Sequence, residues 1–289
     1  MAAVRRLPNR VRDAVTTTVN WAPARTAVKH GAHAAAHARG RYLEARGSLP
    51  EVANIYAASC PKAGSQWTKA LFDHPTVRAH TGLFTLPQFD YYQRRLSTFP
   101  AGTFVPGLYL SFPAYANIPK PHSYRTLYVF RDPRDIVVSG YFASFGAHPD
   151  MLGLAERRAA MESMSVAEGL LHSLQESAHH FRDMATWVDV TDEHVATWRL
   201  EDISADPEGT VPKILAHCGV NLSDTELEQV LRDTSRESLQ RQDLARRAPG
   251  ADSHYRVTRQ SFRELFGPEH YQAVEEVVPG LVARLGYPE

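Results

Sequence analysis

Hydrophobic residues along this chain form two kinds of pattern, and the two alternate from residue 51 onward. Short apolar runs rich in β-forming residues predict strands near 54–59, 77–80, 126–130 and 195–200. Helical spacing and helix-start residues predict helices at 66–72, 133–145, 165–188, 207–218, 224–232 and 268–285. A stretch rich in proline and aromatic residues, 82–121, predicts a long loop. Strands that alternate with helices predict an α/β fold of three layers, in which helices flank a mostly parallel sheet.

A short loop joins the first predicted strand to the first predicted helix, and its residues are typical of an anion site. The sequence from Cys60 to Trp67 places Lys62, Gly64 and Ser65 between the two elements. Backbone N–H groups at a helix N-terminus bind anions, and a lysine adds a full positive charge. In the loop of nucleoside triphosphatases, by contrast, the lysine directly precedes the hydroxyl residue that holds Mg²⁺. The plainer alternative is a generic strand-to-helix turn with a glycine and a core tryptophan.

A second candidate anion site follows the next long buried strand. Arg131 stands at the strand end, Asp132 and Pro133 are typical of a helix start, and Ser139 lies within the predicted helix. Arginine suits a phosphate because its planar guanidinium donates two parallel hydrogen bonds. An Arg131 that pairs with Asp135 on the surface is the plainer alternative. Parallel sheets bind ligands beyond the carboxyl ends of their strands, so both motifs can serve one ligand.

Together the two motifs resemble those of the sulfotransferases that use 3′-phosphoadenosine 5′-phosphosulfate (PAPS) as the sulfate donor. The segment 60–67 is similar to their phosphosulfate loop, and 131–139 is similar to the segment that reads the 3′-phosphate. Weaker similarities follow at 200–203, 233–236 and 255–262. The resemblance implies a sulfotransferase domain over residues 51–289, with a P-loop-like phosphosulfate loop.

The resemblance also implies a role for each matching residue. Lys62 is expected to stabilise charge on the sulfate and on the bridging oxygen, without a metal ion. Two departures, Leu200 and Arg236, stand where relatives carry tyrosine and phenylalanine, so the adenine contacts must differ. The implied donor contacts are the 5′-phosphate at Ala63, Gly64, Ser65 and Gln66, the adenine at Trp67, and the 3′-phosphate at Arg131, Ser139, Ser235 and Arg256.

The general base is the role that the resemblance does not assign. Cytosolic members of the family carry a histidine at the position that corresponds to Ser111, and a neutral serine is no base at pH 7. Three histidines are candidates instead: His80, His148 and His122. We take His80 and His148 as the catalytic candidates, although each could equally be structural. An acidic acceptor, such as a phenol with a lowered pKa, needs little help from a base.

Composition and charge exclude several classes of protein. The 289 residues include 32 basic and 32 acidic side chains, so the formal net charge is zero. The chain therefore lacks the positive charge that is typical of a nucleic-acid-binding protein. Two cysteines, Cys60 and Cys218, cannot form a disulfide framework and favour a reducing, cytoplasmic location. No apolar run is long enough for a transmembrane helix.

Residues 1–50 differ from the rest because they are rich in arginine and alanine and poor in acidic residues. Three interpretations stay open: an interfacial helix in peripheral membrane contact, an organelle transit peptide, and a helical extension that packs on the domain or stays partly disordered. His30, His33 and His37 share one helical face. Such a stripe is more often solvated than metal-binding, so we expect no metal site.

The acceptor is expected to be a hydroxyl group of an alcohol, a phenol, a lipid or a sugar. Aromatic residues between 84 and 115 form either its pocket or part of the core. Two rival functions stay open: a degenerate module that binds PAPS or its product without turnover, which Ser111 favours, and a P-loop nucleotide kinase. A membrane-anchored scaffold led by the basic N-terminus is a third. The oligomeric state is not indicated.

Overall fold

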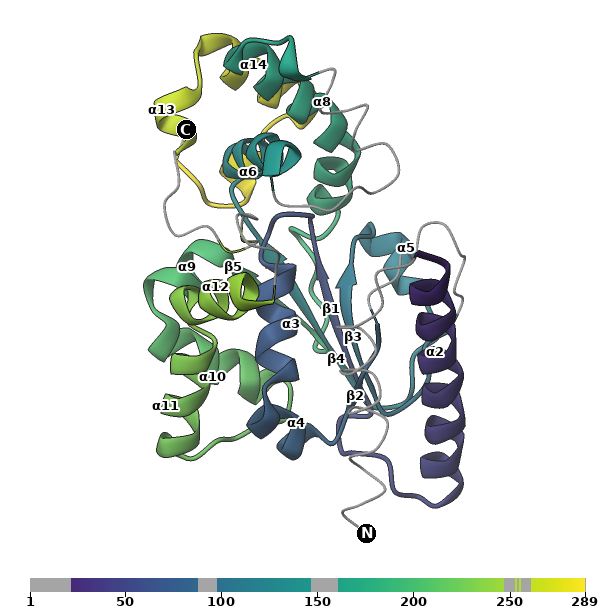
Figure 1. Cartoon of the computed structure of the whole chain (residues 1–289). Coiled ribbons are helices and arrows are strands. Elements are labelled where there is room, and N and C mark those ends of the chain that lie inside the picture. The colour runs from purple at the N-terminus through teal and green to yellow at the C-terminus, as the bar shows by residue number, and fades with distance from the viewer. Residues whose placement is uncertain are drawn as a thin grey trace.

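A five-stranded sheet with helices around it forms the body of the protein in the computed structural model, which describes residues 22–87, 98–146, 161–246, 253, 255 and 261–288 (Figure 1). The strands are β1 (Asn54–Ser59), β2 (Phe84–Thr85), β3 (Thr103–Leu108), β4 (Tyr124–Phe130) and β5 (Val195–Arg199). The first helices are α2 (Ala22–Ala45), α3 (Ser65–Asp73), α4 (Pro75–Thr81), α5 (Phe112–Ala116), α6 (Pro133–Gly146) and α8 (Val166–Ala185). The later helices are α9 (Leu200–Ala205), α10 (Pro207–His217), α11 (Asp224–Asp233), α12 (Arg236–Ala245), α13 (Phe262–Leu265), α14 (Pro268–Val277) and α15 (Leu281–Arg284).

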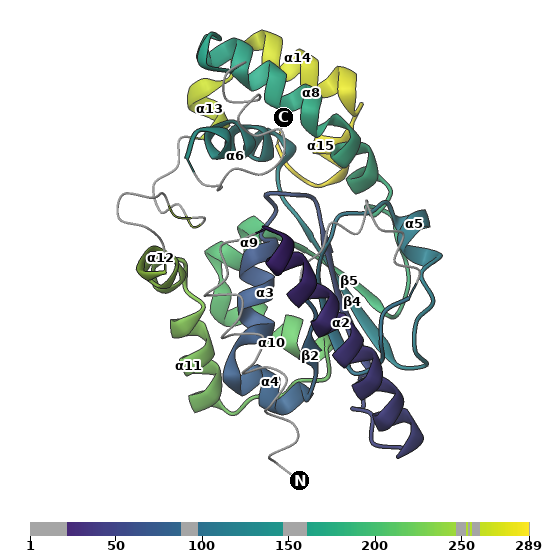
Figure 2. The same ribbon diagram turned by 45° about the vertical axis from the view of Figure 1, so that its right-hand side comes forward.

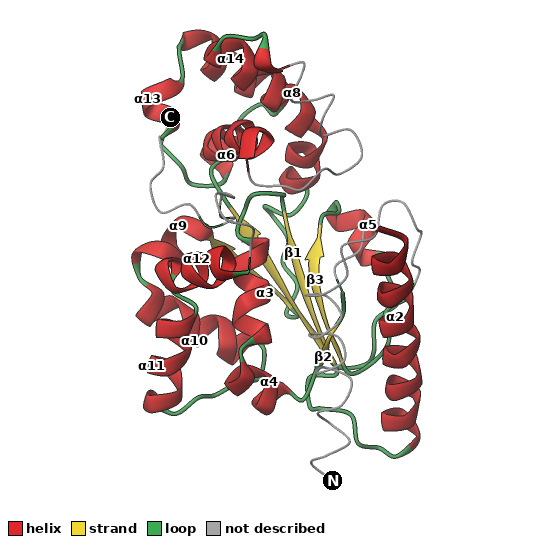
Figure 3. Cartoon of the chain, in the orientation of Figure 1, coloured by secondary structure: helices red, strands yellow, loops and turns green. Residues whose placement is uncertain are grey.

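Every strand pairing in the sheet is parallel, and the strand order is β2-β3-β1-β4-β5. The carboxyl ends of the strands therefore lie at one edge. Helices α3, α10 and α11 lie on one side of the sheet and α2 lies on the other, as Figure 3 shows. The helices α6, α8, α13 and α14 stack beyond the carboxyl edge (Figures 1 and 2). This arrangement places the connections after β1, β3, β4 and β5 between the sheet and the stacked helices.

Side chains of the central strand alternate between two buried clusters. Ile55 and Ala57 join the cluster that includes residues of α3 and α10, whereas Tyr56 and Ala58 join the cluster that includes residues of α6 and α8. All six residues of β1 are buried. A strand buried on both faces is typical of the middle layer of three, so the predicted α/β fold with a parallel sheet is confirmed.

The strand predicted at 77–80 is wrong, because this segment belongs to helix α4. Pro75 occupies the first turn, where its fixed φ suits a helix and its missing N–H is not needed. The ring Nδ1 of His74 accepts a hydrogen bond of 3.3 Å from the backbone N–H of Thr76. A histidine that caps a helix gives little signal in a sequence, and the segment is too short for a clear period.

The loop predicted over 82–121 is wrong over part of its length, because it contains β2, β3 and α5. Strand β3 was hidden by Pro106 and Gly107, which rarely occur inside a strand. Its register with β1 shifts between Tyr56 and Ala58, and Gly107 has a φ of 68°. An irregularity of this kind lets an extra residue fit into one strand, so the ladder continues past the proline.

Helix α2 packs on the body through one arginine. The Arg39 guanidinium donates hydrogen bonds to the carbonyl oxygens of Gly102 (2.9 Å) and Gly82 (2.7 Å). These two residues precede β3 and follow α4, so the helix is fixed to the start of the sheet. Within the described ranges, no helix has the length and apolar character needed to cross a membrane.

Candidate functional site

The loop after β1 has a backbone shape that few residues adopt without strain. Lys62 has a φ of 69° and Gly64 a φ of 91°. The N–H of Ala63 donates to the carbonyl oxygen of Cys60 at 3.1 Å, which closes the turn. Helix α3 then begins at Ser65 with Gly64 as its N-cap, so no capping side chain covers its first N–H groups. Such a start leaves backbone N–H groups that can donate hydrogen bonds to an anion.

Gly64 is required by both its conformation and its neighbour. A Cβ atom on Gly64 would lie 2.8 Å from the Cδ1 atom of Leu200, the first residue of α9. Leu200 is buried in the cluster that contains residues of α3. Leu200 therefore packs against the 60–67 loop and supports it.

We expect Gly64→Ala to lower the free energy of unfolding by about 2 kcal/mol, because alanine is strained at this φ. Urea unfolding of the purified variant measures the change. Gly31→Ala is the matched control: Gly31 lies inside α2, and a Cβ atom there meets nothing within 4 Å. Alanine in a helix interior should stabilise by about 0.5–1 kcal/mol. Equal midpoints for wild type and Gly64→Ala would contradict the requirement.

Arg131 joins the end of β4 to this loop. Its side chain is 3% exposed, and Nη1 donates a hydrogen bond of 3.0 Å to the carbonyl oxygen of Lys62. Burial lowers the pKa of the Arg131 guanidinium, the carboxylates of Asp135 and Glu201 oppose this shift, and the positive charge of Arg236 adds to it. Arginine stays charged nonetheless. The structure thus brings the two sequence motifs together at one edge of the sheet.

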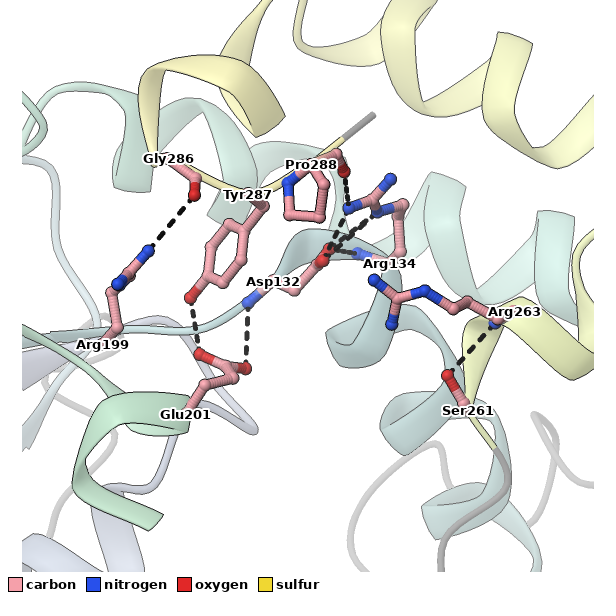
Figure 4. A network of polar contacts seen from close by, with 9 residues as sticks. All are labelled: Asp132, Arg134, Arg199, Glu201, Ser261, Arg263, Gly286, Tyr287 and Pro288. Carbon is pink, nitrogen blue, oxygen red and sulfur yellow. Dashed lines mark hydrogen bonds and ion pairs between the residues drawn. The ribbon is translucent and has the colours of Figure 1, made fainter. Parts of the chain in front are cut away.

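A polar network around Asp132 and Arg134 supports the turn that directly follows Arg131 (Figure 4). The Arg134 guanidinium donates to both carboxylate oxygens of Asp132 and, at 2.6 Å, to the carbonyl oxygen of Pro288. The Glu201 carboxylate accepts from the N–H of Asp132 at 3.4 Å and from the Tyr287 hydroxyl at 2.6 Å. The C-terminal segment therefore supports the start of α6.

Two tyrosines contact the loop from other parts of the chain. The hydroxyls of Ser65 and Tyr109 are hydrogen-bonded at 2.8 Å, and Tyr109 directly follows β3. The Tyr255 hydroxyl donates to the carbonyl oxygen of Gln66 at 3.1 Å. Burial raises the pKa of Tyr255 to about 12. Tyr255 therefore lies against the start of α3.

The remaining residues that were predicted to contact the sulfate donor are Trp67, Ser139, Ser235 and Arg256. Trp67 is half-buried against the cluster of α3 and α10, and Ser139 is half-buried on α6. Ser235 caps α12: its hydroxyl donates to the carbonyl oxygen of Arg232 and accepts from the N–H of Ser238. Its neighbour Arg236 is close enough to act on Arg131. Arg256 lies outside the described residues.

The structure does not bring His80 to these residues. His80 lies on α4, at the end of α3 remote from the loop (Figure 1), and its Nε2 pairs with the Glu226 carboxylate at 3.1 Å. His122 is exposed and precedes β4, at the opposite edge of the sheet. A base must reach the acceptor hydroxyl, so these positions argue against either histidine. His148 lies outside the described residues.

Ser111 is used as a helix cap. Its hydroxyl accepts a hydrogen bond of 3.4 Å from the N–H of Ala114 at the start of α5. Much of the aromatic stretch around it is core, since four of its aromatic side chains are buried: Phe84, Phe99, Phe104 and Tyr115. Tyr109 and Phe112 are half-buried, and Phe89, Tyr91 and Tyr92 lie outside the described residues.

Sequence reasoning missed the titratable residues that α8 carries toward this edge. His180 has its ring centroid 6.4 Å from that of Tyr109. Asp183 acts electrostatically on the Cys60 thiol, whose pKa burial raises far above its usual range. The signal was present as a run of polar residues on one face of a long amphipathic helix, which is normally a solvated face. A buried thiol with a raised pKa is inert, so Cys60 is structural.

In the described part of the chain, no group of three or more histidine, cysteine, aspartate or glutamate side chains could hold a metal ion. The charge at this edge comes instead from lysine and arginine. Such a set of donors suits phosphate and sulfate oxygens, which accept hydrogen bonds from backbone N–H groups and guanidinium groups.

Comparison with known proteins identifies the family. The sulfotransferase domain family matches residues 54–278. Among characterised proteins, the mouse (Mus musculus) sulfotransferases 2A1 and 2A6 are similar to this chain, with 29% identity over 125 residues and 27% over 123. Each alignment covers 42% of this chain and 40% of the relative. The matched part therefore spans well under half of these relatives.

Solved structures with the same fold include two that contain adenosine 3′,5′-bisphosphate (PAP). Mouse sulfotransferase SULT7A1 in complex with PAP has a TM-score of 0.53 at 17% identity, covering 81% of this chain and 86% of that one. Retinol dehydratase in complex with retinol and PAP has a TM-score of 0.50 at 16% identity, covering 81% of this chain and 82% of that one. At these identities the likeness establishes the fold.

Proposed function

The chain belongs to the sulfotransferase family, and from this premise we propose that it transfers a sulfuryl group from PAPS to a hydroxyl acceptor. One observation supports this most strongly: the buried Arg131 guanidinium donates to the carbonyl oxygen of Lys62 at 3.0 Å. The contact couples the two anion motifs, which lie far apart in the sequence. A single donor molecule with phosphates at both ends would bind across them.

We assign the donor contacts as the resemblance implied, and the positions in the fold support most of them. The N-terminus of α3 and the turn before it can bind the 5′-phosphate, because its first N–H groups have no capping side chain. Arg131 can bind the 3′-phosphate, with Arg236 near it. The full set is Lys62, Ala63, Gly64, Ser65, Gln66, Trp67, Arg131, Ser139, Ser235 and Arg256.

PAPS supplies the sulfuryl group, and the protein supplies charge and alignment. Sulfuryl transfer, like phosphoryl transfer, spreads negative charge over the moving group and the leaving phosphate. Lys62 would stabilise that charge from a loop whose backbone is already fixed by Arg131. A fixed cation needs no reorganisation during the reaction, which is the source of the rate gain.

We propose an alcohol or a phenol as the acceptor, with lipid and sugar hydroxyls included in the class. Support comes from the half-buried aromatic side chains of Tyr109, which is bonded to Ser65 of the loop, and of Phe112 three residues further on. The related retinol dehydratase was solved with retinol, which is an apolar alcohol. A series of phenols and aliphatic alcohols tests the class, with mass spectrometry to detect the gain of one sulfate.

We also propose that residues 51–289 form the catalytic domain, that residues 1–50 form an extension, and that the protein acts in the cytoplasm. Two buried free thiols, Cys60 and Cys218, support a reducing compartment. The contacts of Arg39 support an extension that packs on the domain. Sedimentation with anionic liposomes, with and without residues 1–46, tests the peripheral membrane contact.

A module that binds the donor without turnover is the second candidate. The observation that favours it is Ser111, which caps α5 and offers no base. Such a module would bind PAP as tightly as an enzyme does but would transfer no sulfate to any acceptor. The same binding measurement followed by a transfer assay separates the two.

We expect PAP to raise the melting temperature by several degrees, because a ligand at 100 times its Kd stabilises by about 2.7 kcal/mol. Differential scanning fluorimetry measures the shift, with AMP and with Mg²⁺–ATP as controls. AMP lacks the 3′-phosphate that Arg131 would bind, so it should shift the melting temperature less. No shift with PAP, or a shift only with Mg²⁺–ATP, would contradict a shared donor site.

A further inference from the structure

The C-terminal half of α8 carries titratable side chains to the edge of the sheet where the phosphosulfate loop lies. His179, His180 and Asp183 occupy adjacent turns of this helix. The rings of His179 and His180 have centroids 3.8 Å apart, and Asp183 acts electrostatically on Cys60, which precedes the loop. Each of these three side chains can accept a proton, a role that none of the proposed donor-binding residues fills.

Two hydrogen bonds fix the end of α8 against the segment after β3. The Trp187 indole Nε1 donates to the carbonyl oxygen of Leu110 at 2.8 Å, and the N–H of Phe112 donates to the Thr186 hydroxyl at 2.8 Å. Trp187 is fully buried. The helix is therefore held in register with residues 109–112, and His180 keeps a fixed place opposite Tyr109.

Tyr109 connects His180 to the loop. The Tyr109 ring contacts His180 edge-on, with centroids 6.4 Å apart, and its hydroxyl is 2.8 Å from that of Ser65. Ser65 is the residue on which α3 begins. Tyr109 therefore links His180 to the first residue of the helix that begins at the loop.

Burial and, to a smaller extent, the neighbouring His179 lower the pKa of His180 to about 4. The imidazole is therefore neutral at neutral pH, with a lone pair on one ring nitrogen. Asp183 is the rival group: burial raises the pKa of its carboxyl, and His179 opposes this. We favour His180 because its ring contacts Tyr109, whose hydroxyl is bonded to Ser65 at the start of α3, whereas Asp183 acts on the buried, inert Cys60 thiol.

We propose that His180 is the general base of the transfer, an assignment that rests on the proposed function. The acceptor O–H gives its proton to the unprotonated ring nitrogen of His180 while its oxygen bonds to sulfur. The bond from sulfur to the phosphate oxygen breaks, and PAP leaves with that electron pair. His180 then returns the proton to water. A general base contributes about 100-fold to 10,000-fold when its pKa lies near the working pH, and the lowered pKa of His180 places its contribution at the lower end of that range.

Two variants remove the base while keeping the side chain's bulk: His180→Gln and His180→Phe. We expect kcat to fall about 100-fold with a weakly acidic acceptor such as 4-methylphenol, and far less with the more acidic 4-nitrophenol. A purely structural role would lower both rates by the same factor. Added imidazole should restore part of the rate to the variants. His172→Gln is the matched control, because His172 lies on α8 and pairs with Glu176.

The outcomes separate the base from the function as a whole. A wild type that binds PAP but sulfates no phenol or alcohol overturns the proposed function, and the base with it. A wild type that transfers sulfate while both His180 variants keep their rates overturns the base alone. So does a large loss in Asp183→Asn combined with a small, acceptor-independent loss in the His180 variants. The PAP-induced melting shift shows that each variant folds and keeps its donor site.

Discussion

Lys62→Ala is expected to lower kcat by a factor of about 100 to 1000, the usual loss when one group that stabilises transition-state charge is removed. Lys62 lies at the turn between β1 and α3, and its carbonyl oxygen is bonded to Arg131. The backbone bond does not depend on the side chain, so the loop should keep its shape. Steady-state transfer with saturating PAPS measures the change.

The control for Lys62 is a second lysine on the same loop-helix unit. Lys69→Ala removes a cation from α3 that is paired with Asp73 at 2.7 Å. That pair is partly exposed, so its removal should leave kcat within a factor of two or so. Near-normal turnover in Lys62→Ala would refute the assignment. A similar loss in both variants would point to charge in general rather than to Lys62.

Arg134→Met is expected to lower the free energy of unfolding by about 3–5 kcal/mol, because it leaves the Asp132 carboxylate buried without its partner. Arg134 and Asp132 are 3% and 4% exposed, and their closest atoms are 2.8 Å apart. The melting temperature should fall by about 10 °C. Donor affinity should fall too, since Arg131 directly precedes Asp132. Urea unfolding and PAP titration measure the two effects.

An exposed ion pair provides the comparison for Arg134. Arg232 and Glu228 on α11 are 59% and 72% exposed and 3.4 Å apart. Arg232→Gln should change the free energy of unfolding by less than about 1 kcal/mol. The double variant Asp132→Leu with Arg134→Met should recover part of the loss, because no buried charge is then left unpaired. A loss below 1 kcal/mol in Arg134→Met would contradict the role of the pair.

The parts of the fold that the sequence predicted well are those with a strong local pattern. Strands β1 and β4 are buried on both faces and appear as short apolar runs, and their ends carry the two anion motifs. Strand β3 has the same place in the core but contains Pro106 and Gly107. Its pairing with β1 is a long-range interaction that outweighs the low strand propensity of these two residues. The local sequence pattern therefore could not indicate strand β3.

The candidate site was predictable where a residue keeps the role that its motif indicates. It was not predictable for the base, which we propose lies on a different helix from the position that the resemblance indicates. Lys62 and Arg131 keep the chemistry of their motifs, and the fold brings them together. Ser111, which the resemblance aligns with a catalytic histidine, caps helix α5. The proposed base, His180, comes from a helix much further along the chain, and the bonds of Trp187 and Phe112 hold that helix against the segment that contains Tyr109. A residue that tertiary packing brings in from a distant helix has no fixed sequence interval from the anion motifs, so the sequence alone does not indicate it.

The seating of residues 286–288 beside the Arg131 turn has a practical consequence for handling the protein. Arg134 and Arg199 each bond a carbonyl oxygen of this segment, and Tyr287 bonds Glu201 (Figure 4). Affinity tags, fluorescent labels or surface anchors placed next to residues 286–288 would strain the bonds that support the Arg131 turn. Attachment through the opposite end, ahead of α2, leaves those bonds alone and is the better choice for biosensors or immobilised catalysts.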